Sequence, residues 1–170
     1  MTQQQPQLIM RRALDKLPPL RLPPGVSLRS FQEGDGTAWE HIANTAFARD
    51  MRFDSKMRAD PAFRPERVLF LWQGGAPVAT ASAWQKPAFP DTGYLHYVAV
   101  LPGAQGQGLG YWASLAALWR LRDEGFDRAL LQTDDERLPA IKTYLKLGFA
   151  PDRDGAYEER WVAIETALSS

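Results

Sequence analysis

Residues Tyr94–Tyr111 read Y-L-H-Y-V-A-V-L-P-G-A-Q-G-Q-G-L-G-Y, and this stretch decides the fold. Its first half is an apolar and aromatic run of the kind that forms a β-strand. Four glycines follow, and then a long amphipathic helical pattern, Leu109–Glu124, which Gly125 can end. Glycine lets a backbone come close to a ligand, and a helix N-terminus offers free N–H groups and the positive end of its dipole. The stretch therefore predicts an anion site between a strand and a helix, most simply for a phosphate.

The rest of the chain alternates between strand and helix patterns. Gly74-Gly75 joins two apolar runs as the turn of a hairpin does, while Pro139 and Gly148 suit the start and the end of a helix. The order of strand, helices, three strands, helix, strand, helix and strand predicts an α+β, or mixed α/β, fold. The expected strands are Val26–Phe31, Val68–Gln73, Pro77–Gln85, Tyr94–Val100, Ala129–Thr133 and Tyr157–Ile164, and the expected helices are Trp39–Phe47, Leu109–Glu124 and Pro139–Leu147.

The first 24 residues differ in composition from the remainder, because they hold four glutamines and five prolines. Residues 1–24 are interpreted as an extended N-terminal arm. Within it, Met10–Leu17 is expected to form a short helix that Pro18-Pro19 ends. Residues 25–170 show no repeat and no internal linker, so they are expected to form a single domain.

Charge, cysteine content and hydropathy exclude several classes of protein. Twenty basic and twenty acidic residues cancel within 170 residues, which argues against a nucleic-acid-binding surface. The absence of cysteine excludes disulfides, thiolate metal sites and a cysteine nucleophile, and with two histidines no metal site is expected. No apolar run approaches the ~20 residues of a membrane span, and the N-terminus lacks a signal-peptide pattern. A cytoplasmic protein that binds no membrane is expected.

Two nucleotide-binding patterns compete for the glycine-rich stretch. A P-loop is excluded, because no Gly-Lys-Ser/Thr follows the glycines. Gly108–Ala113 does fit the G-x-G-x-x-A pattern of dinucleotide folds, and Asp134 lies about twenty residues further on, where a ribose-binding acid would stand. However, seven residues separate Val100 from Gly108, and only 36 residues remain after Asp134 for further strand–helix units. Both observations count against the dinucleotide alternative.

A third pattern accounts for more of the chain. Gln105, Gly108 and Gly110 fill the pattern Gln/Arg-x-x-Gly-x-Gly/Ala between a strand and a helix. About thirty residues later, Ala140–Phe149 reads A-I-K-T-Y-L-K-L-G-F and matches Ala-Ile-x-x-Tyr-x-x-x-Gly-Phe. Together and in this order, the two motifs resemble those of the GNAT superfamily of acyl-CoA-dependent N-acetyltransferases. The resemblance in element order runs from about Val26 to Ile164.

The resemblance implies a mostly antiparallel, twisted sheet flanked by helices, with acyl-CoA in a cleft between two splayed central strands. It also implies that acetyl-CoA or coenzyme A is the co-substrate, with its pyrophosphate on the backbone of Gln105–Gly110 and its pantetheine arm along Val98 and Val100. The cofactor-binding residues that it implies are Val98, Ala99, Val100, Gln105, Gly106, Gln107, Gly108, Leu109, Gly110 and Tyr111.

The reaction implied by the resemblance is direct transfer of an acetyl group to a primary amine, with both ligands bound. Tyr144 matches the tyrosine to which the family gives the role of general acid, although Ile141 and Leu145 share its helix face and a core position is the alternative. His96 has the near-neutral pKa of a general base. Strand alternation places His96 on one face with Val98 and Val100, and a buried core histidine remains the alternative.

The acceptor side is less defined. By the resemblance, the first helices and their loop cover the acceptor pocket, and Phe47, Asp50 and Phe53 are its candidate contacts, together with Trp84 before the central strand. An ordinary amphipathic surface explains these residues equally well. Arg137 stands where many family members have asparagine; it is interpreted as a solvated loop residue, and a contact with a phosphate or an acidic acceptor is the alternative. The Asp134-Asp135-Glu136 run is likewise interpreted as a solvated turn.

Two functions remain open at this point. The first is an N-acetyltransferase acting on an unidentified small-molecule or peptide amine, and the second is a GNAT module that binds acyl-CoA as a sensor without turnover. Tyr144 and His96 favour the enzyme. A homodimer is a further expectation, because Trp112 and Trp119 on the long helix fit an interface as well as a core.

Overall fold

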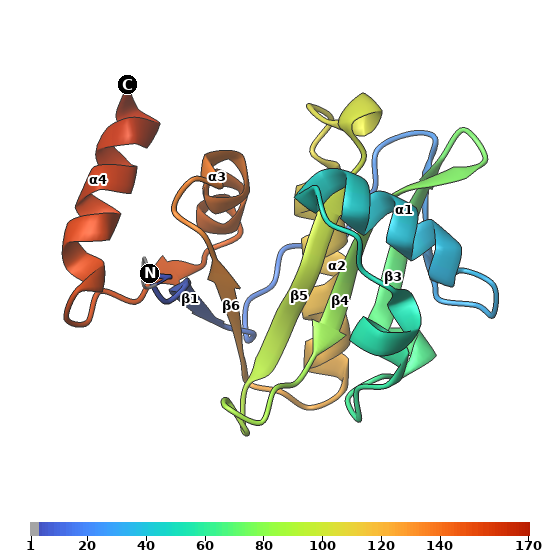
Figure 1. The fold of residues 1–170 in the computed structure, drawn as a ribbon, viewed down its shortest axis with the longest axis horizontal. Coiled ribbons are helices and arrows are strands. Elements are labelled where there is room, and N and C mark those ends of the chain that lie inside the picture. The colour runs from blue at the N-terminus through green and yellow to red at the C-terminus, as the bar shows by residue number, and fades with distance from the viewer. Residues whose placement is uncertain (1–3) are drawn as a thin grey trace.

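The computed structural model describes residues 4–170. Its central element is a seven-stranded sheet. Its strands are β1 (Leu8–Ala13), β2 (Val26–Ser30), β3 (Val68–Gln73), β4 (Ala76–Trp84), β5 (Gly93–Val100), β6 (Arg128–Thr133) and β7 (Ala150–Pro151). They lie in the order β2-β3-β4-β5-β6-β1-β7, and only β5 and β6 pair in parallel. The expected mixed α/β fold with a mostly antiparallel sheet is confirmed (Figure 1).

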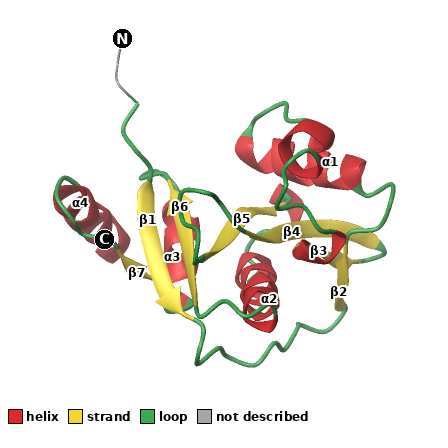
Figure 2. Ribbon diagram, turned by 90° about the horizontal axis from the view of Figure 1, so that it is seen from below, coloured by secondary structure: helices red, strands yellow, loops and turns green. Residues whose placement is uncertain are grey.

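Four α-helices flank the sheet, and Figure 2 shows α1 and α2 on opposite faces of β3 and β4. They are α1 (Gly36–Phe47), α2 (Leu109–Asp123), α3 (Leu138–Lys146) and α4 (Tyr157–Ser169). Shorter turns occupy Asp54–Arg58, Pro65–Arg67 and Pro102–Ala104. Within residues 4–170 no helix is long and apolar enough to cross a membrane.

The two faces of the sheet bury different side chains, because successive residues of a strand point to opposite sides. On the α2 face, the buried side chains of β4 are Ala79, Ala81 and Ala83, and they lie in one core cluster with Leu115 and Leu118 of the helix. The α1 face holds the large aromatic side chains, namely Phe31, Trp39, Phe53, Phe70 and Trp84, all buried.

The N-terminal segment differs from its expected structure. Met10–Leu17 is not a helix, because Leu8–Ala13 forms β1, which pairs antiparallel with β6 over six residues and with β7 on its other side. Leu8 and Met10 are fully buried in the core of the domain. The expected arm over residues 1–24 is therefore wrong for residues 8–13, which lie inside the sheet; residues 1–3 lie outside the described part of the chain.

The C-terminal segment also differs. Tyr157–Ile164 was expected to be a strand, but it is the first part of α4. Tyr157, Trp161, Ile164 and Leu168 pack on the core at intervals of four, three and four residues, which is the spacing of one helix face. The strand expected from the sequence ended at Ile164 and so left out Leu168, the fourth apolar residue of this helix face.

Candidate active site

The two central strands separate soon after they meet. The parallel pairing of β5 and β6 consists of Gly93 with Ala129 and Tyr94 with Leu130. Beyond these pairs the strands diverge toward their carboxyl ends (Figure 1). The edge of β5 that faces β6 then has no strand partner, so its backbone N–H and C=O groups are free to bind a ligand.

One cavity, here called the glycine cavity, lies at the open end of this divergence and has a volume of about 410 Å³. Nine of the ten residues expected to bind the cofactor line it, and α3 closes it with Pro139, Ala140 and Thr143. The nine are Val98, Ala99, Val100, Gln105, Gly106, Gly108, Leu109, Gly110 and Tyr111. Gln107 is the exception, since its side-chain oxygen accepts a hydrogen bond from Gln73 Nε2 at 2.7 Å instead.

The floor of the glycine cavity is backbone. Gly106 and Gly108 have φ values of +83° and +75°, which favour glycine, and a side chain at Gly106 would enter open space. The Trp112 N–H donates to the Gly108 carbonyl at 3.2 Å and closes the first turn of α2. The N–H groups of Leu109, Gly110 and Tyr111 precede that turn and have no intrahelical acceptor. No carboxylate is among the lining residues of the described chain, so the cavity suits an anion.

A second cavity, here called the polar cavity, has a volume of about 180 Å³ and lies deeper between β5 and β6. The strands line it with Tyr94, His96, Tyr97, Gln132 and Thr133, and other segments add Gln7, Phe47, Arg49, Lys86 and Asp134. Three residues line both cavities: Val98, Arg137 and Tyr144. Two ligands, one bound in each cavity, would therefore be in contact beside Tyr144.

Tyr144 comes from α3, where Ile141 anchors the same helix face in the core. The ring packs edge-on against Phe149, with 6.1 Å between centroids, which explains why the two aromatic positions of this motif occur together. Burial raises the pKa of Tyr144 to about 12, and the charge of Arg137 opposes this only in part. The phenol is therefore protonated near neutral pH and is a proton donor at the junction of the cavities.

His96 does not share a face with Val98 and Val100, so that expectation is wrong. β5 carries one extra residue here, because Thr80 pairs with Ala99 while Ser82 pairs with His96. The bulge is at Tyr97, whose φ is +45°. As a result His96 and Tyr97 both lie toward α1, whereas Val98 and Val100 pack toward α2.

The imidazole of His96 is enclosed by aromatic rings. Its centroid lies 3.9 Å from that of Tyr97, 5.4 Å from Tyr94 and 5.7 Å from Trp84. Burial, followed by the positive charge of Lys86, lowers the pKa of His96 to about 3. The ring is therefore neutral near pH 7, and it is a weak base because its protonated form is strongly disfavoured.

The four candidate acceptor contacts have different surroundings. Phe47 lines the polar cavity, and the Arg137 guanidinium lies 4.4 Å from its ring centroid. Asp50 is exposed and lies outside the lining of both cavities. Phe53 is buried and stacks on Phe31, and Trp84 is buried with its indole N–H donating to Asp60 Oδ2 at 3.1 Å. The interpretation of Phe53 and Trp84 as acceptor contacts is therefore wrong, since both are core residues.

Several lining residues were not expected from the sequence. Arg137 is half-buried between the cavities rather than solvated, and Asp134 lines the polar cavity rather than a surface turn. The Tyr94 hydroxyl donates to Gln132 Oε1 at 3.1 Å and thereby spans the gap between the strands. Asp134 follows the carboxyl end of a strand whose neighbour is parallel, a place where ligands bind in open sheets, and this signal could have identified it.

Comparisons with known proteins agree with this geometry. Residues 32–149 match the model of the acetyltransferase (GNAT) family. A mycothiol acetyltransferase from Pseudarthrobacter chlorophenolicus is 37% identical over 152 residues, which cover 82% of this chain and 47% of that protein. The chain spans about half the length of the curated relatives it matches.

Solved structures share the fold. A GCN5-related N-acetyltransferase from Sphaerobacter thermophilus superposes with a TM-score of 0.65 at 22% identity, over 87% of this chain and 50% of that chain. The ribosomal-protein-S18-alanine N-acetyltransferase from Escherichia coli gives a TM-score of 0.60 at 27% identity, over 74% and 77% of the two chains. The matched family model includes the glycine turn and Tyr144, and the chain belongs to the GNAT acetyltransferase family.

Proposed function

We propose that this chain transfers an acetyl group from acetyl-CoA to a primary amine by direct attack, with both ligands bound at once. The observation that carries the proposal is the meeting of two unlike cavities at Tyr144. One is lined by glycine backbone and suits a phosphate, and the other is lined by polar side chains and suits an acceptor. Val98 and Arg137 complete the shared wall.

The glycine cavity fits coenzyme A in two ways. Its free amides at the start of α2 suit the pyrophosphate, because they combine unsatisfied N–H groups with the positive end of a helix dipole. The unpaired edge of Val98–Val100 suits the pantetheine arm, whose amides can pair with a strand edge as an added strand does. Arg137 contributes a cation to the same cavity.

In this proposal the neutral amine attacks the thioester carbonyl, a C–N bond forms, the C–S bond breaks and the thiolate takes a proton from Tyr144; the second proton that the attacking nitrogen loses then restores the phenol. Tyr144 is the donor to the thiolate, since its phenol is protonated and lies where the cavities meet. The chain has no cysteine, so no thiol is available to carry the acetyl group as a covalent intermediate.

The ammonium of the acceptor must lose a proton before it attacks. His96 suits this task poorly, because its pKa of about 3 makes the imidazole a weak base. Asp134 is the single carboxylate among the described residues that line the polar cavity. We assign to it the attraction of the ammonium and the acceptance of its proton, directly or through water.

The acceptor is not given by the relatives, because their names point to different ones. One is called a mycothiol acetyltransferase and another a ribosomal-protein-S18-alanine N-acetyltransferase. Their shared feature is acetyl transfer, which favours an enzyme over a sensor that only binds acyl-CoA. The cytoplasmic location and the homodimer stay predictions.

A thermal-shift titration with acetyl-CoA, CoA and NAD tests the donor side. A ligand that binds only the folded state adds about 2.7 kcal/mol of stability at a hundredfold excess over Kd. We expect acetyl-CoA and CoA, but not NAD, to raise the melting temperature. Release of CoA can then be followed with a thiol reagent without background, because the protein has no cysteine. A cooperative melt that neither CoA species shifts would contradict the proposal.

A further inference from the structure

The polar cavity has an excess of positive charge. Arg49, Lys86 and Arg137 line it, against the one carboxylate of Asp134. Within residues 4–170, none of these three cations has a carboxylate oxygen within 4.0 Å, whereas eight other arginines do. The cations that the chain leaves without an ion pair thus include all three around this cavity.

Lys86 is one of these three candidates for an anion partner. It leaves the end of β4, and its Nζ lies 4.2 Å from the centroid of the Tyr94 ring, at the closed end of the cleft. The residue is half-buried, and burial lowers its pKa while the charge of Asp60 opposes the shift. A partly desolvated ammonium without an ion pair is costly, and an anionic ligand beside it would offset that cost.

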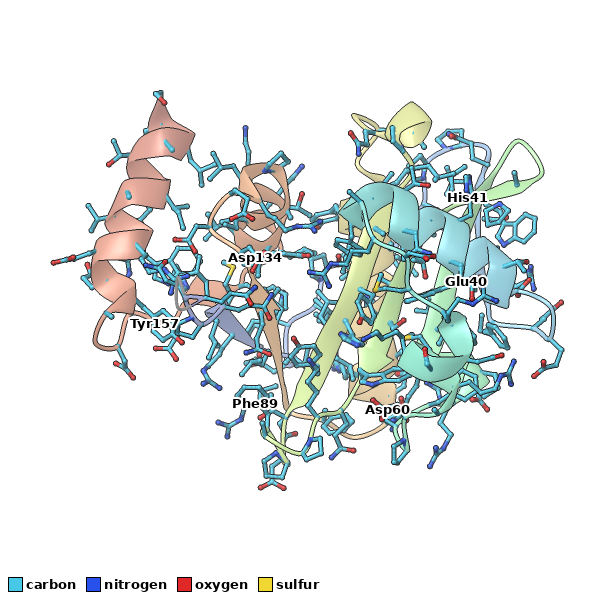
Figure 3. The ribbon with its side chains drawn as sticks, in the orientation of Figure 1. Glu40, His41, Asp60, Phe89, Asp134 and Tyr157 are labelled. Atoms are coloured by element: carbon cyan, nitrogen blue, oxygen red, sulfur yellow. The ribbon has the colours of Figure 1, made fainter. Side chains whose placement is uncertain are left out.

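Asp60 does not neutralise Lys86 by direct contact. Its Oδ2 accepts a hydrogen bond from the indole N–H of Trp84 at 3.1 Å, and its Oδ1 accepts one from the Ala62 N–H at 2.8 Å. Both carboxylate oxygens of Asp60 thus accept hydrogen bonds from groups other than Lys86. Figure 3 shows Asp134 on the β6 side of β5 and Asp60 on the β4 side.

The carboxylate of the polar cavity, that of Asp134, lies toward the end of the cavity opposite Lys86. Asp134 follows the carboxyl end of β6, where its Oδ1 accepts from Gln7 Nε2 at 3.2 Å and its carbonyl accepts from the Arg137 N–H at 3.1 Å. Leu130 pairs with Tyr94 at the closed end. Asp134 is four positions after Leu130, which corresponds to roughly 13 Å of extended chain.

We propose that the acceptor is an extended amine that carries a carboxylate or a phosphate, with its ammonium at Asp134 beside Tyr144 and its anionic group on Lys86. This inference rests on the proposed acetyl transfer. A single α-amino acid is too short, because its ammonium and carboxylate are attached to one carbon. An extended chain spans about 3.3–3.6 Å per residue, so two or three residues fill the distance once the reach of the lysine side chain is allowed for.

A matched panel of acceptors tests this inference. Glycine, diglycine and triglycine are compared with their C-terminal amides at saturating acetyl-CoA, by CoA release. A second arm compares ω-aminoalkyl phosphates with the corresponding amino alcohols and so distinguishes phosphate from carboxylate. We expect kcat/KM to be at least about tenfold higher for the anionic di- or tripeptide, or phosphate, than for its neutral partner, since a hydrogen bond to a charged group contributes roughly that factor.

Variants show whether Lys86 causes the preference. Lys86→Gln should raise KM for the anionic acceptors about tenfold and so remove the discrimination between the anionic acceptors and their neutral partners. Lys86→Arg should keep it. Lys56→Gln is the matched control, because Lys56 is exposed and lies outside both cavities.

The outcomes separate this inference from the proposed function. Equal kcat/KM values for anionic and neutral partners, or a preference that persists in Lys86→Gln, would overturn it while leaving acetyl transfer intact. If no member of the panel is acetylated, the same compounds are tested as stabilisers of the CoA-saturated protein. Failure of the anionic members to stabilise it more than the neutral ones overturns the inference too. Only loss of the acetyl-CoA shift itself would contradict the proposed function.

Discussion

The two cavities that meet at Tyr144 are built from different parts of the chain and with different chemistry. The glycine cavity comes from residues 98–111 and the start of α3, and its binding groups are mostly backbone amides. The polar cavity draws side chains from several separate segments between Gln7 and Tyr144. Backbone amides can bind the same ligand whichever side chains lie next to them. Side chains decide which acceptor is bound, so one fold can keep its donor and change its acceptor.

The largest expected effect lies where the cavities meet. Tyr144→Phe should lower kcat about a hundredfold, the lower end of the usual contribution of a general acid, and should leave acetyl-CoA affinity unchanged. Because the pKa of Tyr144 is about 12, the wild-type rate should not fall through loss of this proton between pH 7 and pH 10. Tyr157→Phe on α4 is the control, since Tyr157 lines neither cavity (Figure 3). An unchanged kcat would remove Tyr144 from the mechanism.

The second effect tests the backbone character of the glycine cavity. Gly108→Ala places a side chain on a residue with a φ of +75°, which costs about 1 kcal/mol or more, and should weaken acetyl-CoA binding about tenfold. Gly75→Ala in the turn between β3 and β4 is matched, because its φ is +78° and it lies outside the cavity. We expect both variants to lose similar stability in denaturant titrations. If Gly75→Ala weakens acetyl-CoA binding as much as Gly108→Ala does, the backbone of the glycine cavity has no specific role in binding acetyl-CoA.

His96 tests whether the polar cavity contains a second proton acceptor. Its pKa in the folded state, about 3, is below the unfolded value of 6.5. Its contribution to stability is therefore complete above pH 6.5 and is lost as pH falls toward 3, by up to about 1.4 kcal/mol per pH unit. His96→Gln should make the unfolding free energy less dependent on pH in that range.

His41→Gln provides the control for the substitution itself, because His41 is exposed and lies outside both cavities. The rate profile gives a second readout. Any ionisation seen in kcat between pH 6 and pH 9 should persist in His96→Gln. Disappearance of such an ionisation would restore His96 as the general base and contradict the burial argument.

The smallest effect separates a lining residue from a core residue. Phe47→Leu removes the ring beneath the Arg137 guanidinium, which is worth about 0.5–1 kcal/mol, and should raise the KM for the acceptor about threefold. Phe53→Leu makes the same change in the buried aromatic cluster. It should lower the melting temperature and leave KM alone. A higher KM in Phe53→Leu than in Phe47→Leu would reverse our placement of the acceptor.

Most of the middle of the chain could be predicted from its sequence. The hairpin of β3 and β4, the strand β5, the helix α2 and the helix α3 have local signals, such as Gly74-Gly75 between two apolar runs and Pro139 at a helix start. The ends could not be predicted as well. Met10 and Leu14 have the spacing of a helix, yet β1 forms because its hydrogen-bonding partners are β6 and β7, more than a hundred residues away.

The sequence by itself determined the glycine cavity, because a phosphate cradle made of consecutive backbone groups requires only a strand, a glycine-rich turn and a helix start in that order. It also placed Tyr144 on the correct helix. The bulge at Tyr97 that turns His96 away from Val98, and the presence of Lys86 and Asp134 in the lining of one cavity, follow from the tertiary structure alone. Local motifs follow from local dihedral preferences, whereas a side-chain-lined cavity depends on where distant strands separate.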